Sequence, residues 1–176
     1  MDHDQTQKLG SWLDSVPKGE LKKYRELTCS QERVKFGTIP VSGTLRGHSS
    51  SLQQLTHITL RRCHVSTGEL VALINCFPNL NYINLEYPIP LHDTNQQISL
   101  TRQHPLEELR IANEGMTPPK VFDELPEPKL HFNEIVFENN NPAVVSANFV
   151  NHILHTFGTG AKTLRLPVVC KGVCDL

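Results

Sequence analysis

Nine histidines and five cysteines are the side chains in this sequence best suited to bind a metal ion or to act as a nucleophile. His152 and His155 are three residues apart and would share one face of a helix. However, no carboxylate or cysteine stands near them at metal-ligand spacing, and no His-Glu-x-x-His motif occurs. Cys170 and Cys174 lack the second pair that a tetrahedral site needs. We therefore expect no metal site and no cofactor.

Motifs for nucleophilic catalysis and phosphate binding are also missing from the sequence. There is no Gly-x-Ser-x-Gly elbow, no Gly-x-Gly-x-x-Gly fingerprint and no Walker loop. The stretch Gly158-Thr159-Gly160 lacks the third glycine and precedes a strand pattern, which is typical of a turn. The sequence thus favours a non-catalytic protein over the alternative, a small α/β enzyme.

The charge balance bears on the kind of partner. The 176 residues are enough for one domain and carry 17 basic and 18 acidic side chains, for a formal net charge of −1. The nearest approach to a basic run is Lys22-Lys23-Tyr24-Arg25, which is typical of a solvated face. We therefore expect neither nucleic acid nor a membrane surface as a partner.

Cysteine usage and hydropathy indicate a compartment. The five cysteines are odd in number and lack paired spacing, which favours free thiols in a reducing environment. Residues 1–15 have no apolar core segment like that of a signal peptide. No stretch approaches the ~18 apolar residues of a membrane span. The sequence therefore predicts a cytoplasmic or nuclear protein.

The clearest structural pattern lies in residues 51–80. Ile58 and Leu60 are two residues apart and so point to one face of a strand. Ser66 and Glu69 then form a capping-box signature for the start of a helix. An apolar stripe with helical spacing follows at Leu70, Leu73, Ile74 and Phe77. The stretch therefore predicts a strand, a turn and a helix.

The strand part of this pattern recurs along the chain. Apolar pairs predict strands near 58–60, 83–85, 109–111, 135–137 and 164–166, at intervals of 25, 26, 26 and 29 residues. Val34 and Phe36, which lie 24 residues earlier, are a candidate sixth copy. A period of 20–29 residues with the template L-x-x-L-x-L-x-x-[N/C] is typical of leucine-rich repeats. Cys63 and Asn140 occupy the Asn/Cys position, whereas Pro88 and Glu114 do not fit it, so the repeat is irregular.

These intervals predict an α/β fold, an irregular leucine-rich-repeat solenoid of about five parallel strands on the concave face. The convex face would carry short helices and loops, with helices over Ser66–Phe77 and Ser146–Phe157 and a shorter one from Pro118 or Pro119 to Leu125. The repeat-like domain would span 34–176, after a polar segment 1–33 with one short helix. The alternative is a doubly wound sheet, but its strands are buried on both faces, whereas the apolar pairs here alternate with polar residues.

The polar positions of these strands would form a ladder on the concave face. Its rungs are His57, Thr59 and Arg61; Tyr82, Asn84 and Glu86; Glu108, Arg110 and Ala112; Glu134, Val136 and Glu138; and Thr163 with Arg165. Tyr82 and Arg110 are of residue types enriched at binding hot spots. The acidic column of Glu86, Glu108, Glu134 and Glu138 disfavours nucleic acid. We therefore predict a protein-binding surface at His57, Thr59, Arg61, Tyr82, Asn84, Glu86, Glu108, Arg110, Glu134 and Glu138, although each alone could be only a solvated strand residue.

The stretch LTHITLRRCHVSTGELVALINCFPNLNYINLEY, which begins at Leu55, resembles the repeats of F-box leucine-rich-repeat proteins abundant in mushroom-forming fungi. The matching residues are Leu55, Ile58, Leu60, Cys63, Leu70, Phe77, Pro78, Asn79 and Leu80. The resemblance is clear over 51–87 and looser over 105–166, and Leu9–Ser15 is similar to a Leu-x-x-Trp-Leu stretch before the repeats.

The resemblance implies an intracellular substrate-recognition subunit of a cullin-RING ubiquitin ligase, in which an F-box binds the adaptor and the repeats present the target. An F-box would need ~40–50 helical residues, and residues 1–33 are shorter and polar. We therefore expect adaptor binding only if an F-box lies upstream. The alternative is a truncated or degenerate repeat fragment, because no polar cap follows the last predicted strand.

Overall fold

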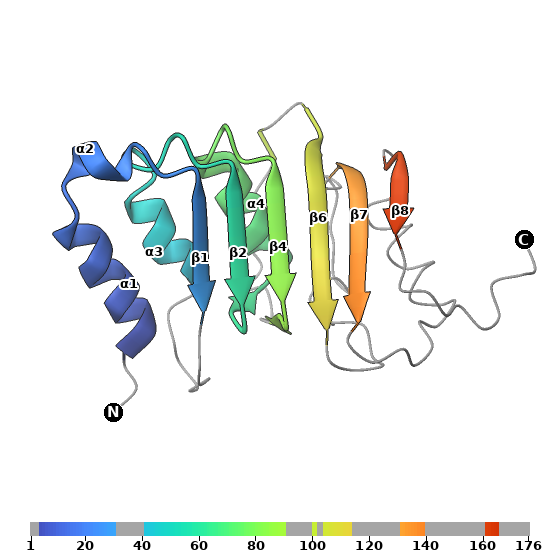
Figure 1. Ribbon diagram of the computed structural model, residues 1–176, viewed down its shortest axis with the longest axis horizontal. Coiled ribbons are helices and arrows are strands. Elements are labelled where there is room, and N and C mark those ends of the chain that lie inside the picture. Colours follow the sequence, from blue (N-terminus) through green and yellow to red (C-terminus); the bar gives the residue numbers. More distant parts are fainter. Residues whose placement is uncertain are drawn as a thin grey trace, which may run out of the picture.

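Alternation of apolar and polar residues produces one parallel sheet. A computed structural model of the chain describes residues 4–30, 41–90, 100–101, 104–113, 131–139 and 161–165. The sheet contains β1 (Glu26–Ser30), β2 (His57–Arg61), β4 (Tyr82–Glu86), β6 (Leu106–Asn113), β7 (Phe132–Asn139) and β8 (Thr163–Arg165) (Figure 1). The predicted α/β class with parallel strands is therefore confirmed.

The strands lie side by side in the order of the chain, β1-β2-β4-β6-β7-β8. Every neighbouring pair is parallel, and the predicted apolar pairs of β2, β4, β6 and β7 are in register across the sheet, together with Leu164 of β8. One such row runs through Ile58, Ile83, Leu109, Ile135 and Leu164. The spacing of 25 and 26 residues thus brings the same repeat position to the same height in successive strands.

Among the described residues, β1 forms the N-terminal edge of the sheet; the expected copy at Val34 and Phe36 lies outside the described residues. Leu27 of β1 is in register with Ile58. Residues 1–33 therefore contribute an edge strand to the sheet, together with α1 (Asp4–Ser15) and α2 (Lys18–Leu21). Leu13 of α1 is buried in the same core as the strands, so the polar segment predicted from the sequence packs with the repeats.

Two helices cover one face of the sheet. In Figure 1, α3 (Val41–Gly47) and α4 (Thr67–Cys76) lie behind the strands. The helix expected from the capping box is α4, and Ser66 Oγ accepts a hydrogen bond from the Glu69 backbone N–H at 3.2 Å. The core between these helices and the sheet includes Leu45, Leu70, Leu73, Ile74, Phe77, Leu60, Ile83, Leu85 and Ile111.

The turn that follows β2 has the same conformation as the turn that follows β4. Arg62 and Tyr87, which follow β2 and β4, both adopt the left-handed conformation, with φ of 53° and 52°. The backbone N–H of Arg62 donates to Glu86 O at 2.7 Å, and that of Tyr87 donates to Ala112 O at 2.8 Å. The chain then forms β3 (His64–Val65) and β5 (Ile89–Pro90), which pair in parallel in a second small sheet.

The buried side chain of Cys63 forms hydrogen bonds to the backbone beside the turn at Arg62. Its side chain is fully buried, and its thiol donates to the backbone oxygens of Arg61 at 3.3 Å and Cys29 at 3.5 Å. A side chain that donates to carbonyls where a strand ends satisfies backbone groups that the sheet leaves open. The cysteine of the repeat template therefore has a local structural role.

Two predicted convex elements fall outside the described residues: the helix over Ser146–Phe157 and the short helix ending at Leu125. No helix of the described segments is both long and apolar enough to cross a lipid bilayer.

Candidate binding surface

The sheet face opposite α3 and α4 is termed the open face, and its side chains form three rows across the strands. The first row contains Glu26, His57, Tyr82, Glu108, Glu134 and Thr163. The second row contains Thr28, Thr59, Asn84, Arg110, Val136 and Arg165. The third row contains Ser30, Arg61, Glu86, Ala112 and Glu138.

The structure places all ten residues of the predicted surface in these rows, in the register expected from the sequence. Sequence reasoning missed Glu26, Thr28 and Ser30, because it placed the edge strand later in the chain. The signal was present in Leu27-x-Cys29, an apolar pair flanked by polar residues. The open face therefore includes β1 in addition to the five strands of the predicted ladder.

A stacked aromatic pair lies in the first row. The rings of His57 and Tyr82 are 4.2 Å apart between centroids and nearly parallel, at 5°. Parallel strands are ~4.8 Å apart, so aromatic residues in register stand face to face. The Thr56 hydroxyl lies 2.8 Å from His57 Nδ1, and Tyr82 remains 37% exposed. The pair is therefore an aromatic feature, held by stacking and by a hydrogen bond, that is in contact with solvent through Tyr82.

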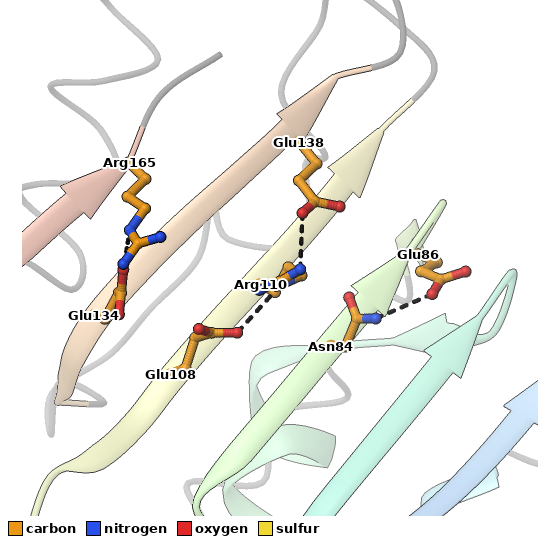
Figure 2. A network of polar contacts seen from close by, with 7 residues as sticks. All are labelled: Asn84, Glu86, Glu108, Arg110, Glu134, Glu138 and Arg165. Carbon is orange, nitrogen blue, oxygen red and sulfur yellow. Dashed lines mark hydrogen bonds and ion pairs between the residues drawn. The ribbon is translucent and has the colours of Figure 1, made fainter.

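Ion pairs tie the second row to both the first and the third row (Figure 2). Arg110 Nη1 lies 2.8 Å from Glu138 Oε1, and its Nε lies 3.1 Å from Glu108 Oε1. Arg165 pairs with Glu134 one strand further along. The hydrogen bond to Glu108 raises the pKa of Arg110 further above its ordinary value, so this guanidinium is always charged.

A third arginine is held in the same way. The Nε of Arg61 pairs with Glu86 on the neighbouring strand. Glu86 also accepts a hydrogen bond from Asn84 Nδ2 at 3.0 Å. Each arginine of the open face is thus already engaged with a carboxylate of the same face. Arg110, predicted as a binding hot spot, makes two such pairs.

The open face carries a net negative charge. Its rows contain five carboxylates, which belong to Glu26, Glu86, Glu108, Glu134 and Glu138. They contain three guanidinium groups, which belong to Arg61, Arg110 and Arg165. The formal net charge of the face is therefore −2.

Two further exposed aromatic residues lie beside the first row. Trp12 of α1 and Tyr24 form an edge-to-face pair with ring centroids 5.9 Å apart, and each is 39% exposed. Tyr24 precedes Glu26, the first residue of β1, by two positions. Within the described segments, Trp12, Tyr24 and Tyr82 are the exposed large hydrophobic side chains. Sequence reasoning did not include the first two in the predicted binding surface.

The described residues hold no group of three or more His, Cys, Asp or Glu side chains that could bind a metal ion. The two pairs considered from the sequence, His152 with His155 and Cys170 with Cys174, lie outside the described residues. Comparisons with protein-family models, with curated proteins and with solved structures found no match. Function is therefore argued from the sheet and its side chains.

Proposed function

We propose that this protein is a non-catalytic protein-interaction module that binds its partner on the open face. The observation that supports this most directly is the stacked pair of His57 and Tyr82 in the first row, in which Tyr82 is exposed to solvent and His57 is half-buried. Exposed aromatic residues that are already held rigid lose little entropy on binding. A pre-ordered face of this kind suits a protein surface or an extended peptide.

We further propose that the sheet belongs to an irregular leucine-rich-repeat solenoid. Three features support this: strands ordered as in the chain, described helices that pack on one face, and the same turn at Arg62 and Tyr87. A doubly wound sheet would carry helices on both faces and reverse its strand order. Each repeat unit of a solenoid contacts mainly its neighbours, which agrees with the register of adjacent strands.

The resemblance to F-box leucine-rich-repeat proteins suggests the physiological role. In this proposal the open face recognises the substrate of a cullin-RING ubiquitin ligase in the cytoplasm or nucleus. Contact with the ligase adaptor requires an F-box upstream of the repeats. A truncated or degenerate repeat fragment is the second candidate, and a small α/β enzyme is disfavoured by the missing catalytic motifs.

Photo-crosslinking from the open face tests the proposal. A photoreactive phenylalanine analogue replaces Tyr82, and a matched control carries it at Glu20 of α2, which is also exposed but lies outside the open face. Both chains are checked for folding by circular dichroism and irradiated in a lysate of a mushroom-forming fungus. Crosslinked proteins are identified by mass spectrometry.

We expect a protein that crosslinks at position 82 and not at position 20. Ligase components recovered with it would support the F-box role, and an in-frame F-box in the genomic sequence upstream of Met1 would support it independently. A folded chain that crosslinks equally from both positions would contradict binding on the open face. A folded chain that captures nothing would favour the degenerate fragment.

A further inference from the structure

The first row differs in charge from the rest of the open face. It carries the carboxylates of Glu26, Glu108 and Glu134 and contains no lysine or arginine. The stacked pair of His57 and Tyr82 lies within it, in register with Glu26 on one side and with Glu108 on the other. An aromatic centre is therefore flanked by carboxylates, of which Glu108 and Glu134 pair with Arg110 and Arg165 of the second row, while Glu26 is exposed at the edge of the sheet.

We propose that the partner of the open face presents a cationic segment, with arginine or lysine side chains that contact the first row. This inference rests on the proposed function and specifies the chemistry of its partner. The net charge of −2 on the face attracts such a segment and repels an acidic or phosphorylated one. The face also carries three arginines, Arg61, Arg110 and Arg165, and each pairs with a carboxylate of the same face. After these pairs are counted, two negative charges remain in excess, and these attract the cationic segment.

The chemistry of the first row suits a guanidinium or ammonium group. Such a cation is attracted to an aromatic ring and forms charge-assisted hydrogen bonds with carboxylates. Tyr82 is 37% exposed, and Glu26 at the edge of the sheet is exposed as well. The cationic side chains of one extended segment would therefore meet an exposed aromatic ring on β4 and an exposed carboxylate on β1, two strands apart.

The length of the row sets the size of the segment. Six strands at ~4.8 Å spacing span about 24 Å, which an extended segment of about seven residues crosses at ~3.3 Å per residue. A short peptide is therefore long enough to make every contact of the first row. This makes the proposal testable before the natural partner is known.

Selection of random peptides tests the partner's charge. A phage-displayed library of peptides about 12 residues long, sufficient to cross the sheet, is selected on the wild-type chain. Enriched peptides are synthesised, and their dissociation constants are measured by fluorescence anisotropy. The variants are Glu26→Gln, Glu108→Gln, Tyr82→Ala and Tyr82→Phe. The control is Glu20→Gln, an exposed carboxylate of α2 outside the open face.

We expect the enriched peptides to carry more Arg and Lys than Asp and Glu. Each first-row Glu→Gln change should weaken binding about fivefold, and Tyr82→Ala should weaken it about tenfold. Tyr82→Phe, which keeps the aromatic ring, and Glu20→Gln should stay within about twofold. Thermal unfolding of each variant verifies that it is folded.

The outcomes that contradict the inference are distinct from those that contradict the proposed function. Neutral or acidic peptides that lose affinity in Tyr82→Ala would leave the open face as a binding surface and overturn the cationic partner. Cationic peptides unaffected by every first-row variant would overturn both, because binding would lie elsewhere. The absence of enriched peptides would also count against both. Light scattering detects self-association of the chain. If self-association depends on Lys22, Lys23 and Arg25, the cationic partner is a second copy of this chain and not a different protein.

Discussion

Arg110 lies at its predicted position, but its side-chain contacts could not be predicted from the sequence. Its residue type and strand position predicted a binding hot spot, and its position on the open face is as expected. Its guanidinium, however, is bonded to Glu108 and Glu138. Spacing along the chain fixes which residues become neighbours in a repeat, but the pairing of long side chains depends on their rotamers. The ladder could therefore be predicted, and its internal ion pairs could not.

A histidine at the junction of α1 and α3 should make stability depend on pH. His48 Nδ1 lies 3.1 Å from Thr44 O, and Nε2 lies 2.9 Å from Asp14 Oδ1. A neutral imidazole donates from only one nitrogen, whereas the cation donates from both. The bonds to Thr44 and Asp14 therefore raise the pKa of His48 above its ordinary value of 6.5.

Because the folded-state pKa is raised, the stabilising contribution of His48 is fully present below pH ~6.5 and is lost as the pH rises through the folded pKa. His48→Gln should therefore lower the free energy of unfolding more at pH ~5.5 than at pH ~8.5, with a difference below about 1 kcal/mol for so exposed a pair. Urea unfolding at both pH values measures this. A stability loss of His48→Gln that is independent of pH would contradict a pH-dependent contribution of His48. Asp14→Asn should show the same dependence on pH.

A buried cysteine should be unreactive in the folded protein. Burial, with a smaller contribution from the neighbouring Cys63, raises the pKa of the Cys29 thiol to about 12. Because the thiolate is the reactive form, iodoacetamide at pH ~8 should label Cys29 only after unfolding. Cys76, which is less buried, provides the internal reference, and peptide mass spectrometry measures both. Equal labelling of Cys29 and Cys76 in the folded chain would contradict the burial of Cys29.

At the scale of elements, the strands could be predicted because their apolar pairs recur at nearly constant intervals. The exception is β1, where a regular interval pointed to Val34 and Phe36. The strand lies earlier, with Leu27 in register with Ile58 at a separation of 31 residues. An edge repeat contacts only one neighbour, so its connection can vary in length while its register is kept. Period alone therefore identifies central strands more reliably than edge strands.

The capping box of α4 predicts a measurable contribution to stability. Ser66 Oγ accepts a hydrogen bond from the Glu69 N–H, and the serine is almost completely buried. Ser66→Ala should lower the free energy of unfolding by about 1 kcal/mol, because an N-terminal N–H loses its acceptor. Ser11→Ala, at an exposed position of α1, should stay within about 0.5 kcal/mol. Chemical denaturation measures both, and equal effects would contradict a capping role for Ser66.

At the scale of the whole molecule, the two faces of one sheet differ in character. The apolar positions pack against α3 and α4, and the polar positions form the open face. The chain as a whole carries a formal charge of −1, whereas the open face alone carries five carboxylates and three guanidinium groups. Negative charge is therefore concentrated on the side that faces away from the helices, where the proposed partner binds.

Carboxyl footprinting, with and without the partner identified by photo-crosslinking, tests most directly whether that partner binds on the open face. Carbodiimide-activated coupling of an amine labels exposed carboxylates, and mass spectrometry reads each site with and without partner. Binding on the open face predicts that labelling of Glu26 and Glu138, both exposed in the unbound chain, falls several-fold while labelling of Glu20 on α2 is unchanged. Unchanged labelling of Glu26 and Glu138 together with protection of Glu20 would contradict it and place the partner on another surface.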